Sequence, residues 1–283
     1  MTGMDMARNT VWDKALPVTP DHEVRLLLDA AAVLDEDHQL KTTILSAFGM
    51  HETATKMSVQ FLDTSGKDLC NSSWSARIRR IENKPGLELT FKKRFDIAEG
   101  DIDEALALAS ERGFAIGDNK NEVQVEWGYM KQTLSISRKK WVAEPDSAGL
   151  DLPGTKDSRQ MLTEGVPDQF NNWCCNKWGI SAIAASGIFG PIIVSRWDGF
   201  WKGLRLYIEV WPILDAAGIG FDYMVEASFT TNCRTTAAGE QANLQAFLMD
   251  KGWFVASDSG KTKLIMERYS SYPGLENTDF KEF

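Results

Sequence analysis

The sequence predicts a mainly β fold of the α+β class, built on one antiparallel sheet system. Its 283 residues are 43% hydrophobic and 25% charged, a composition typical of a globular protein with a sizeable core. About eight segments alternate apolar and polar side chains with the period of two that strands have. Helical patterns are few and short, which favours a sheet system over a helical bundle or an alternating βα fold.

The clearest alternation surrounds Pro85-Gly86, which predicts a turn between strands at Ser75–Arg80 and Leu87–Phe95. Because successive strand side chains point to opposite faces, Arg77 and Arg79 share one face of this hairpin. On the second strand, one face holds Glu88, Thr90 and Lys92, and the other holds Leu87, Leu89 and Phe91. One surface of the hairpin is therefore apolar, and the other carries several cations at close range.

The remaining elements follow from the same periodicities. Strands are predicted at Glu23–Asp29, Val59–Asp63, Val123–Tyr129, Thr133–Ser137 and Lys263–Arg268, and through much of 190–230. Helical spacing predicts helices at Asp101–Arg112 and Gly239–Gly252. The uncharged run Gly179–Ser195 is predicted to be a buried helix that turns into a strand. Loops are predicted at the acidic segment Asp35–His38 and at Ala143–Asp168, the latter with one helical turn at Gln160–Thr163. Residues 1–20 are predicted to be a leader and residues 21–283 a single domain.

Two later segments also divide charged from apolar side chains. Between Leu204 and Trp211, one face holds Leu204, Leu206, Ile208 and Val210, and the other holds Arg205, Tyr207, Glu209 and Trp211. Between Phe221 and Phe229, the apolar face holds Tyr223, Val225, Ala227 and Phe229, and the opposite face holds Asp222, Met224, Glu226 and Ser228. Two architectures fit this pattern. Either the charged faces meet solvent on an open sheet, or a closed barrel turns them inward around a polar lumen.

Net charge and segment composition exclude several classes of partner. The formal net charge of −9 argues against binding to nucleic acid or to anionic membranes, which needs a positive surface. The N-terminal residues lack the apolar stretch of a signal peptide, and the uncharged run Gly179–Ser195 is too short for a membrane span. Four cysteines without CxxC spacing suit a reducing compartment. We expect a cytoplasmic protein with a small-molecule substrate and neither nucleic-acid nor membrane partners.

Several strand motifs together resemble those of a known superfamily. They are Glu-x-Arg-x-Leu at Glu23–Leu27, Phe-Leu-Asp-Thr at 61–64, Ala-Arg-Ile-Arg at 76–79, Leu-Thr-Phe-Lys at 89–92, Val-Ser-Arg-Trp at 194–197, Leu-Tyr-Ile-Glu-Val-Trp at 206–211 and Tyr-Met-Val-Glu-Ala-Ser at 223–228. In this order they resemble the CYTH superfamily, the triphosphate tunnel metalloenzymes. The resemblance implies an antiparallel, eight-stranded tunnel barrel with helices packed outside.

The resemblance also implies roles for particular residues. The phosphate-binding cations would be Arg77, Arg79, Lys92 and Arg196, which suits a ligand that needs several converging positive charges. Catalytic roles would fall to Glu23, Glu209 and Glu226, with Arg25 beside them. Glu23 and Glu226 would hold Mg²⁺ or Mn²⁺, because hard divalent cations need carboxylate oxygens.

The sequence departs from the family at the strands that would hold the metal. Arg25 replaces the second carboxylate of Glu-x-Glu-x-Lys, Leu27 replaces its lysine, and Ser228 replaces the second carboxylate of the last Glu-x-Glu. A Glu23/Arg25/Glu226 ion-pair network is therefore an alternative to a metal site.

Three functional hypotheses follow. In the first, the protein is a phosphohydrolase of the triphosphatase type that acts on a phosphorylated organic substrate. In the second, a repurposed tunnel without metal catalyses cyclisation or isomerisation of an apolar metabolite through Glu209, Glu226 and Arg25, helped by Trp and Tyr walls. In the third, the tunnel binds a phosphorylated ligand without catalysis. The tryptophans Trp173, Trp178, Trp197, Trp201 and Trp211 are interpreted either as core residues or as such a wall.

Overall fold

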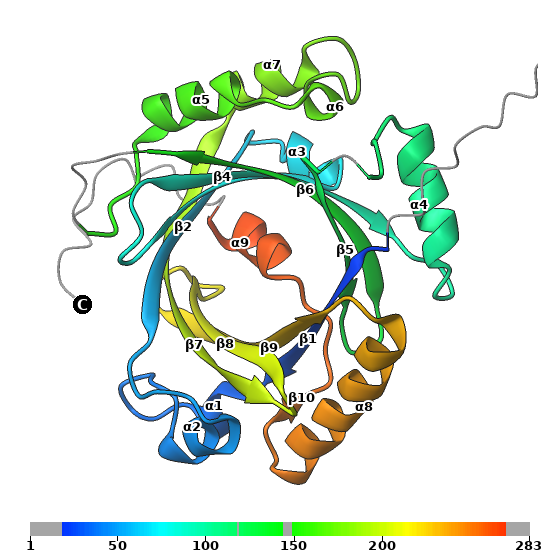
Figure 1. Ribbon diagram of the computed structural model, residues 1–283. Coiled ribbons are helices and arrows are strands. Elements are labelled where there is room, and N and C mark those ends of the chain that lie inside the picture. The colour runs from blue at the N-terminus through cyan, green and yellow to red at the C-terminus, as the bar shows by residue number, and fades with distance from the viewer. Residues whose placement is uncertain (1–18, 118, 144–148, 270–283) are drawn as a thin grey trace, which may run out of the picture.

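A closed barrel forms the centre of the molecule (Figure 1). The computed structural model describes residues 19–117, 119–143 and 149–269, and within these ranges the barrel has nine strands in the order β1-β5-β6-β4-β3-β2-β7-β8-β9. The pairing of β1 with β9 closes the ring, and the short β10 adds to β1. The predicted mainly β tunnel barrel is confirmed, with nine strands in place of eight. The sheet is mixed, because β1 pairs with β5 in parallel.

The bounds of the elements are as follows. The strands are β1 Asp21–Leu28, β2 Thr55–Asp63, β3 Trp74–Ile81, β4 Leu87–Asp96, β5 Glu122–Trp127, β6 Gln132–Val142, β7 Gly187–Trp201, β8 Leu204–Leu214, β9 Phe221–Thr231 and β10 Phe254–Val255. The helices are α1 Ala30–Val33, α2 Thr42–Phe48, α3 Asp68–Asn71, α4 Ile102–Glu111, α5 Thr155–Glu164, α6 Asp168–Asn171, α7 Trp178–Ala185, α8 Arg234–Asp250 and α9 Lys261–Tyr269.

The outer face of the barrel carries the main hydrophobic core. Strand residues of alternating position, such as Leu26, Leu89 and Ile208, are buried there beneath α2, α4, α7 and α8, which surround the ring of strands. The other alternate positions face the lumen. They carry charged groups such as Arg77, Lys92 and Glu209 on several strands and apolar residues on much of β2 and β7. The predicted division into an apolar and a charged face is therefore confirmed for 87–92, 204–211 and 221–229. The apolar face packs in the outer core, and the opposite face lines the lumen. None of the helices in the described ranges has the length and apolar character needed to span a bilayer.

The hairpin predicted around Pro85-Gly86 is present as β3 and β4. Gly86 has a φ of +83°, and a Cβ at this position would lie 2.2 Å from the carbonyl oxygen of Val142. Only glycine fits such a turn, because it tolerates a positive φ and a close backbone approach. The register pairs Arg77 with Thr90 and Arg79 with Glu88, so the two arginines face the same carboxylate.

Two predicted elements differ from the structure. The segment Lys263–Arg268 was expected to be a strand but lies within helix α9, and the single turn at Gln160–Thr163 is part of the ten-residue helix α5. A run of three apolar residues such as 264–266 fits either a buried strand or a helix face, and its tertiary contacts decide which forms. The first 18 residues of the predicted leader lie outside the described residues.

Helix α9 differs from the other helices in its position, because it lies within the ring of strands (Figure 1). Its residues Ile265, Met266 and Tyr269 are buried against an apolar part of the inner wall. That part is formed by Met57, Val59 and Phe61 of β2, Ile192 and Val194 of β7, and Trp211 and Ile213 of β8. The expectation that helices pack outside therefore holds for the others and not for α9.

Candidate functional site

The buried carboxylate of Glu126 is the centre of the first charged group in the lumen. Its side chain is 1% exposed, and it accepts hydrogen bonds from Arg25 Nη2 at 2.6 Å, Lys92 Nζ at 2.8 Å and Arg94 Nε at 3.1 Å. Glu23 joins this group through an oxygen 3.9 Å from Arg25 Nε. Burial alone would raise the pKa of Glu126, but the three cations hold that pKa well below its usual value. We call these five residues the Glu126 group.

Glu88 on β4 is the centre of a second group with Arg77 and Arg79 of β3. The Nη2 atoms of Arg77 and Arg79 lie 3.0 and 2.8 Å from Glu88 Oε1. Burial opposes ionisation of Glu88, but the two guanidinium groups lower its pKa to about 2. Burial, followed by the neighbouring charge of Arg79, lowers the pKa of Arg77 to about 10, so Arg77 stays cationic at neutral pH. We call these three residues the Glu88 group.

A third group, the Glu209 group, brings Glu209 and Glu226 together with Arg196 and Lys261. Arg196 Nε donates to Glu209 at 2.8 Å, and Lys261 Nζ lies 3.1 Å from Glu209 and 2.8 Å from Glu226. The indole Nε1 of Trp211 also donates to Glu209 at 2.9 Å. Burial opposes ionisation of Glu209, yet Lys261 and Arg196 lower its pKa, so the carboxylate stays charged.

The three groups together contain more positive than negative charge. Seven cations, Arg25, Arg77, Arg79, Lys92, Arg94, Arg196 and Lys261, accompany the five carboxylates Glu23, Glu88, Glu126, Glu209 and Glu226. The surplus of two charges lies in the Glu126 and Glu88 groups. The Nε atoms of Arg25, Arg77 and Arg79 are buried and have no hydrogen-bond acceptor in the described part of the chain. Buried donors without acceptors are costly unless a ligand or ion satisfies them.

The residues predicted for the site thus all face the lumen. Several of them form ion pairs with neighbours that the sequence analysis did not assign to the site. Arg77 and Arg79 share Glu88, while Arg25 and Lys92 share Glu126. Glu126 and Arg94 lie on predicted strands at inward positions, so strand alternation could have found them. Lys261 could not be found in this way, because the docking of α9 into the lumen brings it there.

The arrangement does not fit the divalent ion expected at Glu23 and Glu226. Glu226 pairs with Leu27 across β1 and β9, so Glu23 lies four residues, about 13 Å, away along the strand. Oxygen ligands of one such ion lie within about 2.6 Å of it. Cations of the protein, Arg25 and Lys261, already contact these two carboxylates. Among the described residues, no three His, Cys, Asp or Glu side chains are grouped so that they could hold a metal ion.

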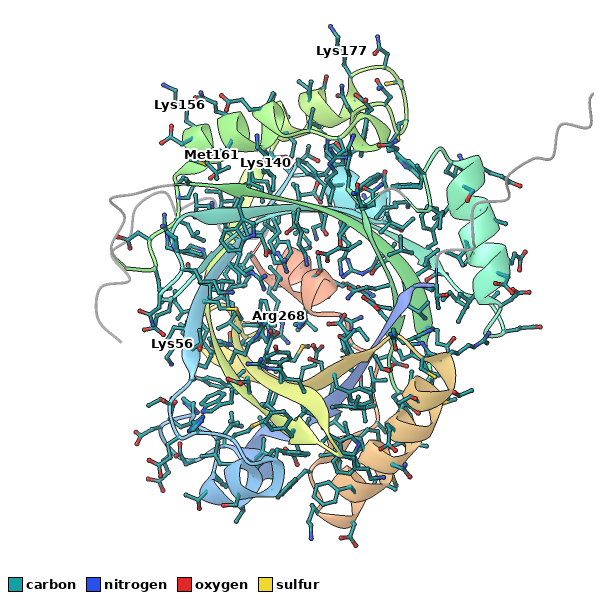
Figure 2. The ribbon with its side chains drawn as sticks, viewed as in Figure 1. Lys56, Lys140, Lys156, Met161, Lys177 and Arg268 are labelled. Atoms are coloured by element: carbon teal, nitrogen blue, oxygen red, sulfur yellow. The ribbon has the colours of Figure 1, made fainter. Side chains whose placement is uncertain are left out.

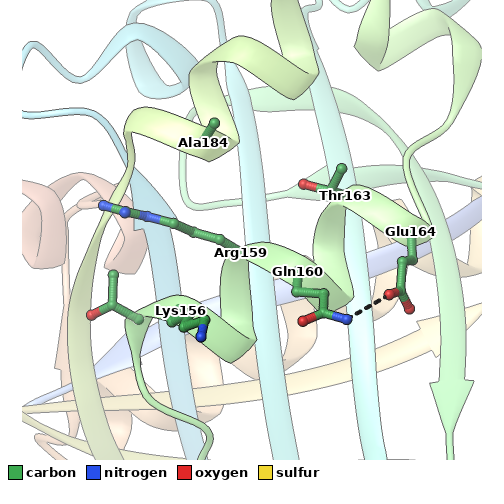
Figure 3. A pocket seen from close by; sticks show the side chains of 7 residues that line it. Lys156, Arg159, Gln160, Thr163, Glu164 and Ala184 are labelled. Carbon is green, nitrogen blue, oxygen red and sulfur yellow. Dashed lines mark hydrogen bonds between the residues drawn. The ribbon is translucent and has the colours of Figure 1, made fainter.

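Two cavities differ in how they relate to these groups. One of about 300 Å³ lies where α9 meets β1 and β9, and its wall includes Leu27, Met224 and Leu264. Figure 2 shows Arg268, which also lines it, inside the ring of strands. The other, an open groove of about 660 Å³, lies on α5 and α7 outside the barrel, beside Lys156 and Arg159 (Figure 3).

The five tryptophans predicted as either core or lumen wall are mostly core. Trp211 faces the lumen, where its ring centroid is 4.7 Å from Lys261 Nζ. Trp197 is buried in the outer core, and Trp201 donates to Glu240 of α8. Trp173 makes an edge-to-face contact with Trp74, and Trp178 makes a tilted ring contact with Phe170, both outside the barrel. An aromatic wall of the lumen is therefore limited to Trp211 among these five.

Comparisons with known proteins find similarity in solved structures alone. No family model matches the sequence, and no curated protein matches it. HpAC1 from Hippeastrum, a proposed adenylyl cyclase with a dominant triphosphatase activity, is similar with a TM-score of 0.48 and 15% identity over 87% of this chain and 94% of that one. A proposed adenylate cyclase from Bacillus halodurans has a TM-score of 0.46 and 13% identity, over 86% of this chain and 96% of that one.

A third similar structure is protein PH1819 from Pyrococcus horikoshii OT3, with a TM-score of 0.44 and 10% identity over 87% of this chain and 98% of that one. These similarities carry neither the fold assignment nor any residue role. The strand order itself confirms the tunnel barrel that the motifs predicted. The molecule is therefore a closed β-barrel with a charged lumen, whose architecture agrees with the resemblance to the CYTH superfamily.

Proposed function

We propose that the lumen binds the phosphate chain of a small organic di- or triphosphate and hydrolyses its terminal phosphoanhydride bond. One observation carries the proposal: Arg77 and Arg79 share a single carboxylate, and each keeps a buried Nε donor without an acceptor in the described chain. Phosphate oxygens are strong acceptors for guanidinium groups, which match them in charge and in geometry. A phosphate chain beside Glu88 would satisfy both donors and offset the surplus charge.

Lys92 and Arg196 extend this phosphate-binding surface to the neighbouring groups. The charges of Glu209 and Arg196 act on Arg77, which supports one continuous site across the Glu88 and Glu209 groups. Lys92 shares Glu126 with Arg25 and Arg94, so three cations near that carboxylate are only partly neutralised. Several cations spread along the lumen favour a chain of phosphates over a single phosphate.

In the proposed reaction, a water attacks the terminal phosphorus and the bond from phosphorus to the bridging oxygen breaks. The shortened phosphate chain leaves with the negative charge that develops on that oxygen, and the arginines stabilise it. Glu23 would orient the water and accept its proton, because its contact with Arg25 is long, at 3.9 Å. The carboxylates of Glu88, Glu126, Glu209 and Glu226 each form a closer contact with a cation.

The cavity beside α9 suits the organic part of the ligand. Leu27 lines this cavity and pairs directly with Glu226, so the apolar wall adjoins the charged groups. Leu27, Met224 and Leu264 would cover an apolar moiety. We place the protein in the cytoplasm with a small molecule as its partner, in line with its net charge and the absence of CxxC pairs.

Metal-free cyclisation of an apolar metabolite is less well supported. Of the acid–base groups in that hypothesis, Glu209 has its pKa lowered by Lys261 and Arg196, which makes it a poor proton donor at neutral pH. Glu226 is already bonded to Lys261 at 2.8 Å. The lumen also contains one of the five tryptophans that would have formed the apolar wall.

Release of inorganic phosphate from tripolyphosphate and nucleoside triphosphates tests the hydrolase proposal, with Mg²⁺ and separately with EDTA. We expect the wild type to release phosphate and the Arg77→Ala/Lys92→Ala variant to lose at least a hundredfold in rate. Arg138→Ala is the control, because Arg138 pairs with Phe91 on the outer face. Wild-type release that does not exceed that of the double variant under either condition would refute hydrolysis.

A further inference from the structure

Glu209 and Glu226 form a like-charged pair that requires a cation between them. They are direct partners on the antiparallel strands β8 and β9, and both side chains are at most 8% exposed. Carboxylates directly opposite each other repel, and low exposure weakens the screening by water. To persist as two carboxylates, the pair therefore needs positive charge close to both groups.

The neighbouring strands place a directly opposite cation beside one member alone. Arg196 of β7 pairs with Glu209 in the register and donates to it. On the other side, the partner of Glu226 on β1 is Leu27, which carries no charge. Arg25, two residues along β1, interacts electrostatically with Glu226 but donates its hydrogen bond to Glu126. Glu226 therefore has no cation directly opposite it on either neighbouring strand.

Lys261 supplies the missing charge from α9. Its Nζ lies 2.8 Å from Glu226 Oε1 and 3.1 Å from Glu209 Oε2, a bridge between the two carboxylates. The face of Trp211 covers the ammonium, with the ring centroid at 4.7 Å. Arg25 also acts electrostatically on the Lys261 ammonium. The buried side chains of Ile265, Met266 and Tyr269 hold α9 in the lumen.

Two carboxylates on neighbouring strands are also what a hard divalent ion needs from a protein. An ammonium group and a divalent ion cannot both occupy the space between the same oxygens. We infer that Lys261 is the resident cation of the Glu209–Glu226 pair and excludes divalent metal from it, so that removal of Lys261 turns the pair into a divalent-cation site. This inference goes beyond the proposed function and does not depend on a phosphate ligand.

Mn²⁺ binding to the purified full-length protein, measured by electron paramagnetic resonance without any phosphate compound, tests this inference. Lys261→Met removes the ammonium and keeps most of the apolar stem. We expect it to bind one Mn²⁺ at least tenfold more tightly than the wild type does. The matched control is Lys263→Ala, because Lys263 is on the same helix and 78% exposed. This control should behave as the wild type, and Lys261→Met/Glu226→Gln should lose the gained site.

Thermal unfolding gives a second readout where Lys261→Met is unstable. Mn²⁺ should then raise the Tm of Lys261→Met and leave the Tm of Lys261→Met/Glu226→Gln unchanged, since an ion that binds only the folded state stabilises it. The inference is overturned if Lys261→Met gains neither affinity nor Tm from Mn²⁺. It is equally overturned if the wild type binds Mn²⁺ at a site that Glu226→Gln abolishes. Neither result depends on phosphate hydrolysis, which can fail or succeed separately.

Discussion

The two halves of the lumen wall differ in what their side chains contact. On β1, β3, β4 and β5, charged residues pair within the Glu126 group and within the Glu88 group, and both groups keep buried donors without acceptors in the described chain. On β2, β7 and β8, apolar residues such as Met57 and Val194 pack against α9. The first half keeps donors that suit the proposed anionic ligand, whereas the second is already filled by α9. The proposed function therefore depends on the charged half, and the apolar half holds α9 in place.

Removal of Glu126 should have the largest effect on stability, because three cations of the charged half share this carboxylate. Glu126→Ala leaves Arg25, Lys92 and Arg94 close together without their shared carboxylate. We expect a loss of about 4 kcal/mol in the free energy of unfolding, measured by urea denaturation.

Glu122→Ala on the same strand is the matched control for this change. The side chain of Glu122 is 50% exposed and pairs with Lys139, so its loss should cost less than about 1 kcal/mol. Equal effects of the two substitutions would mean that the buried cations do not depend on Glu126.

Acid should destabilise the charged half through Glu88. The pKa of this group is depressed in the folded state to about 2, below the ordinary value of 4.5. Its contribution is therefore present above pH 4.5 and lost as the pH falls toward 2. We expect Glu88 to account for about 3 kcal/mol of this loss. Urea denaturation between pH 5 and 2.5 should show a flatter pH dependence for Glu88→Gln, and an unchanged slope would contradict the role of Arg77 and Arg79.

A small change in the apolar half should affect stability and leave ligand binding intact. Ile265→Val removes one methyl group from a fully buried side chain of α9, which should cost about 1 kcal/mol in the free energy of unfolding. Lys263→Ala on the exposed side of the helix should change it by less than about 0.5 kcal/mol. The division into two halves would be wrong if folded Ile265→Val lost its affinity for tripolyphosphate.

The sequence predicted the charged half better than the apolar half, for physical reasons. Strand alternation separated Arg77, Arg79 and Lys92 from the apolar face of the hairpin, because a period of two gives each strand one apolar and one polar face. The motif resemblance supplied the closure of the sheet into a barrel. The apolar inner residues of β2 and β7 and the helix α9 depend on each other over long distances in sequence. Local pattern does not encode such docking, so Lys263–Arg268 was predicted as a strand, and Lys261 was missed.

Calorimetric titration with tripolyphosphate in EDTA, at fixed ionic strength, tests most directly whether the surplus charge of the lumen binds phosphate. We expect one binding site in the wild type and a 10- to 100-fold weaker Kd in Arg77→Ala, roughly the loss of one charge-assisted contact. Arg138→Ala, on the outer face, should bind as the wild type does. Equal affinities of Arg77→Ala and Arg138→Ala, or no binding to the wild type, would contradict phosphate binding by the charged lumen.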